Sequence, residues 1–259
     1  MTSISVLLVL VLAVITMPVQ AGSTEINIAA AADLSSVLPE LAATYQKQTG
    51  VIVRLSFGSS GNLAQQIKNG APFDLFFSAD EDYPQQLVHA GLAESNSMQR
   101  YAQGRLVLWA LSDSPLDIQH RGLEILTEPS IQKIAIANPQ HAPYGRAAEA
   151  ALKHAQLFEK ISGKLVLGEN VSQAAQFVES GNAQVGLIAL SHALAPGLKD
   201  KGRYWVIPTD FYAELNQAAV VLSRSQHKKE AAAFLAYLKT PEARAMLQRF
   251  GFALSGEAR

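Results

Sequence analysis

The chain has 259 residues, of which 49 % are hydrophobic, and a formal net charge of −1 at pH 7. This length is sufficient for two lobes with separate cores, and the composition is that of an ordinary globular protein. The balanced charge and the lack of a basic run argue against nucleic-acid binding. The sequence contains no cysteine, which excludes disulfides, thiolate metal sites and cysteine nucleophiles.

The N-terminal segment has the pattern of a secretory signal peptide. An unbroken apolar run from Val6 to Ile15 is followed by Val19-Gln20-Ala21, a small-x-small cleavage site. The run is too short to span a bilayer as a permanent helix. Residues 1–5 contain no Lys or Arg, which departs from the usual pattern. We expect residues 1–21 to be a cleaved signal peptide that directs the protein out of the cytoplasm.

The remaining chain alternates between short apolar strands and amphipathic helices. In the first hundred residues the predicted strands cover 26–31, 51–57 and 73–79, with helices starting near Leu34 and Leu63 and a further helix after the third strand. Further strands are predicted over 105–111, 134–137, 165–167, 185–190, 204–207 and 218–222. Further helices are predicted over 145–160, 172–178, 228–239 and 241–250. This alternation indicates βαβ units and parallel sheets, and hence an α/β fold.

Four turns share one pattern, in which a strand ends, small or polar residues follow, and a helix begins. They are Ala31-Ala32-Asp33, Gly58-Ser59-Ser60-Gly61-Asn62, Pro143-Tyr144-Gly145 and Glu169-Asn170-Val171-Ser172. Each helix start leaves backbone N–H groups without intrahelical partners and carries a partial positive charge. Several such starts converging on one point would bind an anion, and Ser59, Ser60 and Ser172 offer hydroxyl donors. Each turn alone is more typical of an ordinary helix cap or βα loop than of a ligand site.

Enzyme motifs are not found in the sequence. Position 62 is Asn where a Gly-x-Ser-x-Gly nucleophile elbow needs its second Gly. Gly197 and Gly202 have the spacing of a phosphate loop, but Arg203-Tyr204 follow instead of Lys-Ser/Thr. The six His residues lack metal-ligand spacing. His141 lies beside one of the four turns, and we expect it at the rim of a cleft. These observations favour a binding protein over an enzyme, with no cofactor.

Several stretches together resemble one family, the periplasmic molybdate-binding proteins of ABC transporters. The most specific is Gly70-Ala71-Pro72-Phe73-Asp74-Leu75-Phe76-Phe77-Ser78-Ala79-Asp80, within residues 58–80. The similarity extends over residues 101–109, 136–145, 169–174 and 251–252, and thus over essentially the whole mature chain.

The resemblance implies an α/β fold of two doubly wound lobes with a hinge and a ligand cleft between them. It places lobe 1 at residues 22–105 and 217–259 and lobe 2 at residues 106–216. The expected function is periplasmic capture of molybdate, and of tungstate, as the substrate-binding component of an ABC importer. The expected partners are the permease in the inner membrane and its ATPase, and the protein is expected to be a monomer.

The resemblance also implies a set of neutral donors around the oxyanion. Ser60 would donate its hydroxyl and its N–H group, Tyr144 and Val171 would donate N–H groups, and the first turn would contribute through Ala32 and Asp33. Molybdenum would be present only as the central atom of the oxyanion, held through its oxygens by these same residues.

Two positions depart from the family pattern. Many relatives have Ser or Thr-Asn where this chain has Ala32-Asp33. We expect the Asp33 side chain to turn away as a helix cap while its N–H group binds; alternatively, it accepts a hydrogen bond from a protonated oxyanion. Some relatives place a Tyr hydroxyl where this chain has Ala189, and Tyr144 or Tyr212 could supply it instead. Sulfate or phosphate binding is therefore the alternative, and a hydrolase using Ser60 and His141 is the least favoured one.

Overall fold

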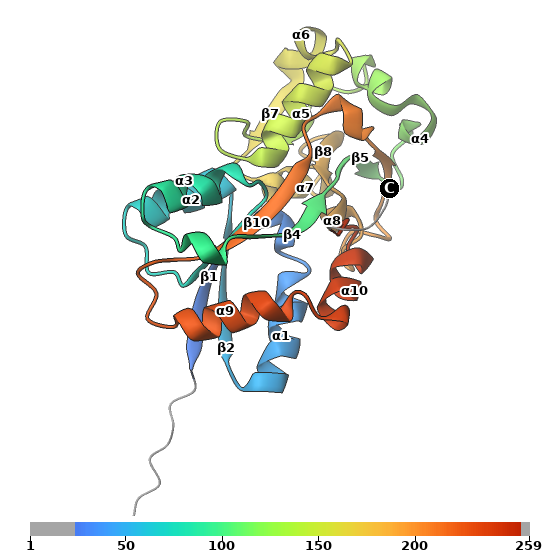
Figure 1. Ribbon diagram of the computed structural model, residues 1–259. Helices are drawn as coiled ribbons and strands as arrows, with labels where there is room; N and C mark the ends of the chain where they lie inside the picture. The colour runs from blue at the N-terminus through green and yellow to red at the C-terminus, as the bar shows by residue number, and fades with distance from the viewer. Residues whose placement is uncertain (1–23, 255–259) are drawn as a thin grey trace, which may run out of the picture.

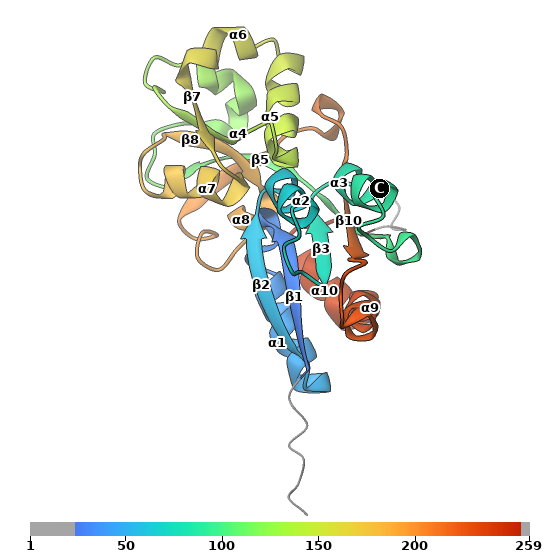
Figure 2. The ribbon, with the colours of Figure 1, turned by 90° about the vertical axis from the view of Figure 1, so that its left-hand side faces the viewer.

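The computed structural model describes residues 24–254, which form two five-stranded sheets in separate halves of the molecule (Figures 1 and 2). The predicted signal peptide, residues 1–21, lies outside the described residues and stays a prediction. Within residues 24–254, no helix combines the length and the apolar character needed to cross a membrane.

The first sheet has the strand order β2-β1-β3-β10-β4. Its strands are β1 Glu25–Ala31, β2 Ile52–Gly58, β3 Leu75–Ser78, β4 Gln99–Gly104 and β10 Leu215–Val221. Its helices are α1 Leu38–Thr49, α2 Ser60–Lys68, α3 Asp82–His89, α9 Lys228–Tyr237 and α10 Pro241–Arg249, with the short 3-10 helices η1 Ala32–Leu34 and η2 Ser95–Ser97. Strand β1 pairs in parallel with β2 and β3, whereas β10 is antiparallel to β3 and β4.

The second sheet has the strand order β7-β6-β8-β5-β9. Its strands are β5 Leu106–Leu111, β6 Ile134–Ala137, β7 Leu165–Gly168, β8 Val185–Ala189 and β9 Gly202–Val206. The helices are α4 Ile118–Arg121, α5 Pro143–His154, α6 Phe158–Ile161, α7 Val171–Glu179 and α8 Leu190–Ala193, with η3 Gly122–Thr127, η4 Ser162–Lys164 and η5 Thr209–Phe211. Strand β6 is parallel to β7 and β8, whereas β5 is antiparallel to β8 and β9.

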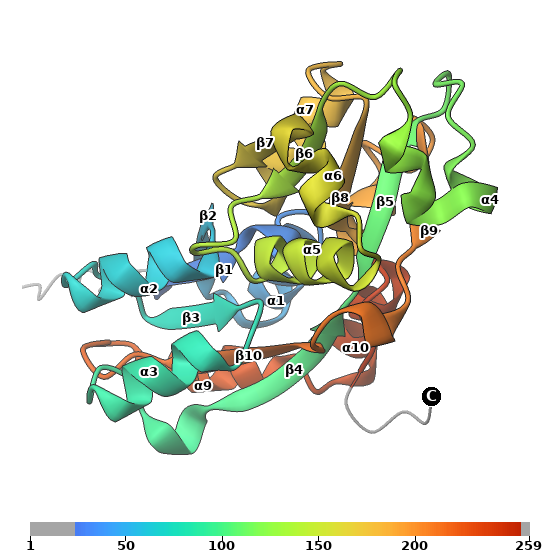
Figure 3. The same ribbon diagram turned by 90° about the horizontal axis from the view of Figure 1, so that it is seen from above.

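The chain crosses between the sheets twice. It leaves the first sheet at the end of β4 and enters the second at Leu106, so that β5 continues almost directly from β4 (Figure 3). It returns between β9 and β10, and β10 begins at Leu215. Strand β5 begins at the predicted start of lobe 2, residue 106, and β10 begins two residues before the predicted return at residue 217. The division into two lobes, and their separate movement, stays a prediction.

Three local expectations are wrong. The sheets are mixed rather than parallel, because the strand that enters each half from the other half, β10 in the first and β5 in the second, runs antiparallel to its neighbours. The polar strand β4 was not expected, and it forms through its ladder with β10. The helix predicted over 145–160 ends at His154, because Gln156 adopts a left-handed φ of 57°, and α6 follows separately.

The helix expected from Leu34 is likewise interrupted. Residues 32–34 form only the short helix η1, and α1 begins at Leu38, with Pro39 in its first turn. Proline favours this position because it has no N–H group to leave unsatisfied. The interruption keeps Ala32 and Asp33 in a tight turn at the end of β1, where they face the second half of the molecule.

Each sheet is anchored by its own apolar core. Strands β1 and β3 bury Ile26, Ile28 and Phe77 against α1 and α9, and strand β5 buries Leu108 and Trp109 in the second half. Burial of each such side chain stabilises the fold by roughly 1.5–3 kcal/mol. Two separately packed bodies thus present the carboxyl ends of β1, β2, β6 and β7 to one another.

Candidate functional site

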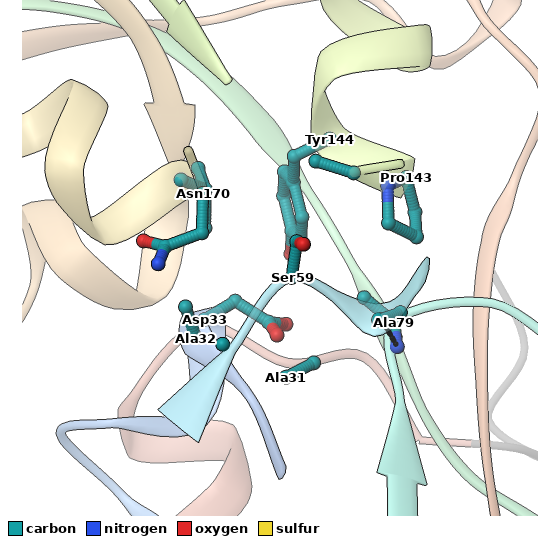
Figure 4. A pocket seen from close by; sticks show the side chains of 12 residues that line it. Ala31, Ala32, Asp33, Ser59, Ala79, Pro143, Tyr144 and Asn170 are labelled. Atoms are coloured by element: carbon teal, nitrogen blue, oxygen red, sulfur yellow. Dashed lines mark hydrogen bonds between the residues drawn. The ribbon is translucent and has the colours of Figure 1, made fainter. Parts of the chain in front are cut away.

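A small cavity lies between the two halves, where strands end and helices begin (Figure 4). It is lined by Ala31, Ala32, Asp33, Gly58, Ser59, Ser60, Ala79, Ala142, Pro143, Tyr144, Asn170 and Val171. The structure thus brings together all five residues predicted for the site, although their contact with a ligand stays a prediction. The space open to the centre of a water molecule is about 10 Å³, which suits a compact ligand of few atoms.

Three α-helices begin at this cavity. Helix α2 starts at Ser60, α5 at Pro143 and α7 at Val171. In residues 24–254, the backbone N–H groups of Ser60, Tyr144 and Val171 make no hydrogen bond to another backbone group outside their own helices, and the first turn of a helix offers them no partner within it. Unpaired N–H groups and three helix dipoles therefore point at one small space, and both favour an anion there.

Ser60 adds a hydroxyl to these N–H groups. Its side chain is fully buried, and its Oγ atom accepts a hydrogen bond from the Ala79 N–H group at 3.0 Å. A hydroxyl that accepts one hydrogen bond keeps its own proton for another acceptor. The contact with Ala79 at the end of β3 thus orients the Ser60 hydroxyl as a donor.

Helix α7 is capped by Asn170 rather than by Ser172. The Asn170 side chain accepts hydrogen bonds from the N–H groups of Ser172 and Gln173 at 3.0 and 3.1 Å. This cap leaves the Val171 N–H group free and fixes its direction. Ser172 does not line the cavity but a neighbouring hollow, so the expectation that its hydroxyl adds a donor to this site is not met.

Asp33 does not behave as expected from the sequence. The N-cap positions are Ala31 for η1 and Val37 for α1, so the expectation that Asp33 turns away as a helix cap is wrong. Its side chain is fully buried and points toward Tyr144 in Figure 4. Oδ2 accepts a hydrogen bond from the side-chain amide of Gln217.

Burial raises the pKa of Asp33 to about 6, although hydrogen bonds from the Gln217 and Tyr144 side chains oppose the rise. A second buried ionisable group, His192, lies close to η1, with its Nε2 atom 3.2 Å from the Ser35 hydroxyl. Burial lowers the pKa of His192 to about 4. Asp33 therefore ionises at a higher pH than an ordinary Asp, and His192 takes up its proton at a lower pH than an ordinary His.

Two site residues were missed in the sequence, Gln217 on β10 and Tyr101 on β4. The Tyr101 hydroxyl donates to Gln217 Oε1 at 2.7 Å, and Gln217 Nε2 lies 3.4 Å from the Tyr144 hydroxyl. Gln217 is 184 positions from Asp33, so no local motif joins them. The available signal was a Gln within the apolar run of residues 215–221, because a polar side chain there needs a buried partner.

Of the two tyrosines considered as substitutes for the donor that Ala189 lacks, Tyr144 lines the cavity and Tyr212 does not, and donation to a ligand by either stays a prediction. Ala189 is not among the residues lining the cavity. The Tyr212 hydroxyl accepts the Leu106 N–H group at 3.1 Å instead, and the Tyr144 hydroxyl faces Asp33 and Gln217.

Polar contacts cross between the two halves at the rim of the cavity. His141 Nδ1 lies 2.8 Å from Ser59 Oγ, and its carbonyl accepts the Gly61 N–H group at 2.9 Å. Asn62 donates to Glu169 at 2.8 Å, and Arg146 pairs with Asp80. His141 thus occupies the rim, as expected. It contacts Ser59 rather than Ser60, so the pair proposed for a hydrolase is not formed in the described structure.

A family model of bacterial extracellular solute-binding proteins matches residues 26–253. The chain belongs to this family. ModA of Azotobacter vinelandii, a molybdate-binding protein, is 37 % identical over 234 residues, which are 90 % of this chain and 92 % of that protein. ModA of Rhodobacter capsulatus is also 37 % identical, over 91 % of this chain and 90 % of that protein.

Solved structures agree with this family. The periplasmic molybdate-binding protein of Azotobacter vinelandii matches with a TM-score of 0.83 and 35 % identity, over 88 % of this chain and 99 % of that chain. The sulfate-binding protein SubI of Mycobacterium tuberculosis matches with a TM-score of 0.72 at 19 % identity, over 90 % and 88 % of the two chains, which shows a shared fold alone. The predicted α/β fold and the resemblance to the molybdate-binding proteins are thereby confirmed.

The buried carboxylate of Asp33 should reduce the stability of this solute-binding protein at high pH. Its pKa of about 6 lies above the ordinary value of 3.8 for an aspartate, so the free-energy cost of its ionisation is absent below pH 4, grows between pH 4 and 6, and is constant above pH 6. The shift corresponds to roughly 3 kcal/mol. In urea unfolding, Asp33→Asn should be more stable than the wild type by up to about that amount at pH 8, and equal to it near pH 4.

The matched control is Asp113→Asn, on an exposed turn, which should leave the free energy of unfolding within about 0.5 kcal/mol at both pH values. The contribution of His192 cancels, because it is the same in all three proteins. Equal stability of Asp33→Asn and the wild type at pH 8 would contradict the cost assigned to Asp33.

Proposed function

We propose that this chain is the extracytoplasmic substrate-binding component of an ABC importer that binds molybdate and tungstate. The observation that carries the proposal is the convergence of the N-termini of α2, α5 and α7 on one cavity. The two ModA relatives, named as molybdate-binding proteins, support this choice of ligand. Related solved structures include the substrate-binding domain of a putative molybdenum ABC transporter from Clostridium difficile.

The cavity suits a tetrahedral oxyanion held by neutral donors. None of its 12 lining residues is Lys, Arg or His. The proposed donors are the N–H groups of Ser60, Tyr144 and Val171 and the Ser60 hydroxyl, with the turn at Ala32 and Asp33 as a further contributor. A hydrogen bond to a charged acceptor contributes roughly 1.5–3 kcal/mol, so four or five give micromolar or tighter affinity after the costs of association.

Molybdenum enters this proposal only as the centre of its oxyanion, with no side chain bonded to the metal. Within residues 24–254, no group of three or more His, Asp or Glu side chains is placed to hold a metal ion. The same donors would bind sulfate or phosphate, since all are tetrahedral oxyanions. Discrimination then depends on the size of the closed cavity and on Asp33.

The proposed place of action is the periplasm, where the closed protein would deliver its anion as a monomer to a permease driven by an ATPase. Rim contacts such as Arg146–Asp80 and Asn62–Glu169 join surfaces of the two halves around the cavity and are suited to a closed state. The curated relatives are named as binding proteins rather than enzymes, which supports transport without chemistry on the ligand.

Calorimetric titration of residues 22–259 with molybdate, tungstate, sulfate and phosphate tests the proposal. We expect one-to-one binding of molybdate and tungstate, with Kd values at least 100-fold lower than for sulfate and phosphate, because the two ModA relatives are named as molybdate-binding proteins. Preference for sulfate or phosphate would replace the proposed ligand, and binding of none of the four would reject an oxyanion receptor.

Ser60→Ala should weaken molybdate binding by roughly 1–3 kcal/mol, which is about 5- to 150-fold in Kd, because it removes a buried hydroxyl donor. The matched control is Ser172→Ala, since Ser172 lies in the first turn of α7 but outside the cavity. It should change Kd by less than about twofold. Unchanged affinity in Ser60→Ala, measured by the same titration, would remove the hydroxyl from the proposed donor set.

A further inference from the structure

The cavity between the two sheets contains one buried carboxylate that is not neutralised by a cation. Asp33 is fully buried and lines the cavity. Its Oδ2 atom accepts the Gln217 amide, whereas Oδ1 is buried without a hydrogen-bond partner among the described residues. None of the ion pairs found in residues 24–254 includes Asp33. An unpaired carboxylate oxygen thus lies at the site proposed for an anion.

The buried ionisable groups around Asp33 supply no positive charge. His192 lies on α8, which packs against η1. Its pKa is lowered to about 4 by burial, so the ring is neutral near pH 7. Tyr101 on β4 and Tyr144 on α5 have pKa values raised well above the ordinary range by burial, so both are neutral donors. None of these three side chains carries the positive charge that would stabilise a buried carboxylate.

Charged groups at the rim do not neutralise Asp33 either. Arg146 is paired with Asp80, and Glu169, just before α7, bonds to Asn62. Strand β2, which also packs against η1, contributes only Gly58 to the cavity lining. The elements packed around Asp33 therefore present neutral groups to it. The rim carries the Arg146–Asp80 ion pair, whose charges cancel, and the Glu169 carboxylate.

A dianion bound in the cavity would lie against the Asp33 carboxylate. Two negative charges in contact at a buried site strongly disfavour one another, because little water remains to screen them. A proton on Oδ1 removes this repulsion. It binds the carboxyl oxygen that has no hydrogen-bond partner. It also converts an acceptor into an O–H donor that faces the cavity.

We propose that Asp33 contacts the bound oxyanion and binds one proton together with it. The inference deepens the proposed function and rests on it. The dianion and one proton from solvent enter the site, the Asp33 carboxylate becomes a neutral carboxyl group, and no bond within the anion changes. The complex then contains the dianion, neutral donors and no second negative charge.

Gln217 and Tyr101 prepare Asp33 for this role. The Tyr101 hydroxyl donates to Gln217 Oε1 at 2.7 Å, which turns Nε2 toward Asp33. Nε2 donates a hydrogen bond to Oδ2 and leaves Oδ1 available to bind the proton. Because an amide is neutral, it holds the carboxyl group in place without stabilising the ionised form as an arginine would.

The pH dependence of binding follows with a defined sign. Burial holds the pKa of Asp33 at about 6 in the free protein, and a bound dianion raises it further. Below pH 6 the proton is already in place, so affinity is constant. Above pH 6 each binding event takes up a proton, so Kd rises by up to about tenfold per pH unit until the pKa of the complex is reached.

Calorimetry of molybdate binding between pH 6 and 8.5 tests this proposal, with HEPES and Tris compared at pH 7.5 to count protons. The wild type should take up about one proton per anion, and Asp33→Asn about none, because an amide mimics the neutral acid but does not titrate. At pH 8, Asp33→Asn should bind about 10- to 100-fold more tightly than the wild type. Asp80→Asn, the matched rim variant, should retain the proton uptake.

One-to-one binding without proton uptake, and with a Kd independent of pH in the wild type, would overturn the role of Asp33 and leave the proposed function intact. Proton uptake that persists in Asp33→Asn and disappears in Asp80→Asn would assign the proton to the rim and also overturn it. No binding of any oxyanion at pH 6 would remove both proposals together, because about half of the Asp33 side chains are then protonated and repulsion could weaken the affinity only about twofold.

Discussion

The site depends on one constraint, which is that the first N–H groups of a helix have no partner within the helix. This protein places three such helix starts, those of α2, α5 and α7, around one cavity and leaves donors there unpaired. Because α2 follows the first sheet and the other two follow the second, neither half can complete the donor set alone. The two-sheet architecture, the crossings after β4 and β9, the cap at Asn170 and the Ser60–Ala79 hydrogen bond all serve this arrangement.

The same cavity carries an opposing feature in Asp33. Burial favours the neutral form of every ionisable group, so it raises the pKa of Asp33 and lowers that of His192. Between about pH 4 and 6 the two groups change the stability of the fold in opposite directions, and they partly cancel. The cost of the carboxylate therefore persists above pH 6, where neither group titrates further. Asn or Ser at position 33 would accept a hydrogen bond from Gln217 without the free-energy cost of a buried charge. The presence of Asp there argues for a role in the site itself.

The sequence predicted the α/β class, most strands and the turns that line the cavity, because apolar periodicity and turn residues are local signals. The polar strand β4 was missed because it forms only through pairing with β10. The end of α5 was missed because the reversal at Gln156 interrupts a continuous apolar pattern. Asp33 was misread as a cap, since the same side chain suits a cap or a buried network. Its partner Gln217 is distant in sequence, so only tertiary structure could decide.

The rim contacts bear on how such a site opens. Arg146 is 40 % exposed in its pair with Asp80, and the Asn62–Glu169 contact is at the surface. Exposed pairs of this kind contribute about 0–1 kcal/mol each, since water competes for them and salt screens them. Hydrogen bonds from both halves to a buried anion are individually stronger. Under the proposed function, the anion would therefore supply more of the free energy of closure than the rim does. Loss of the anion would then favour separation of the two halves, as delivery to a membrane partner requires.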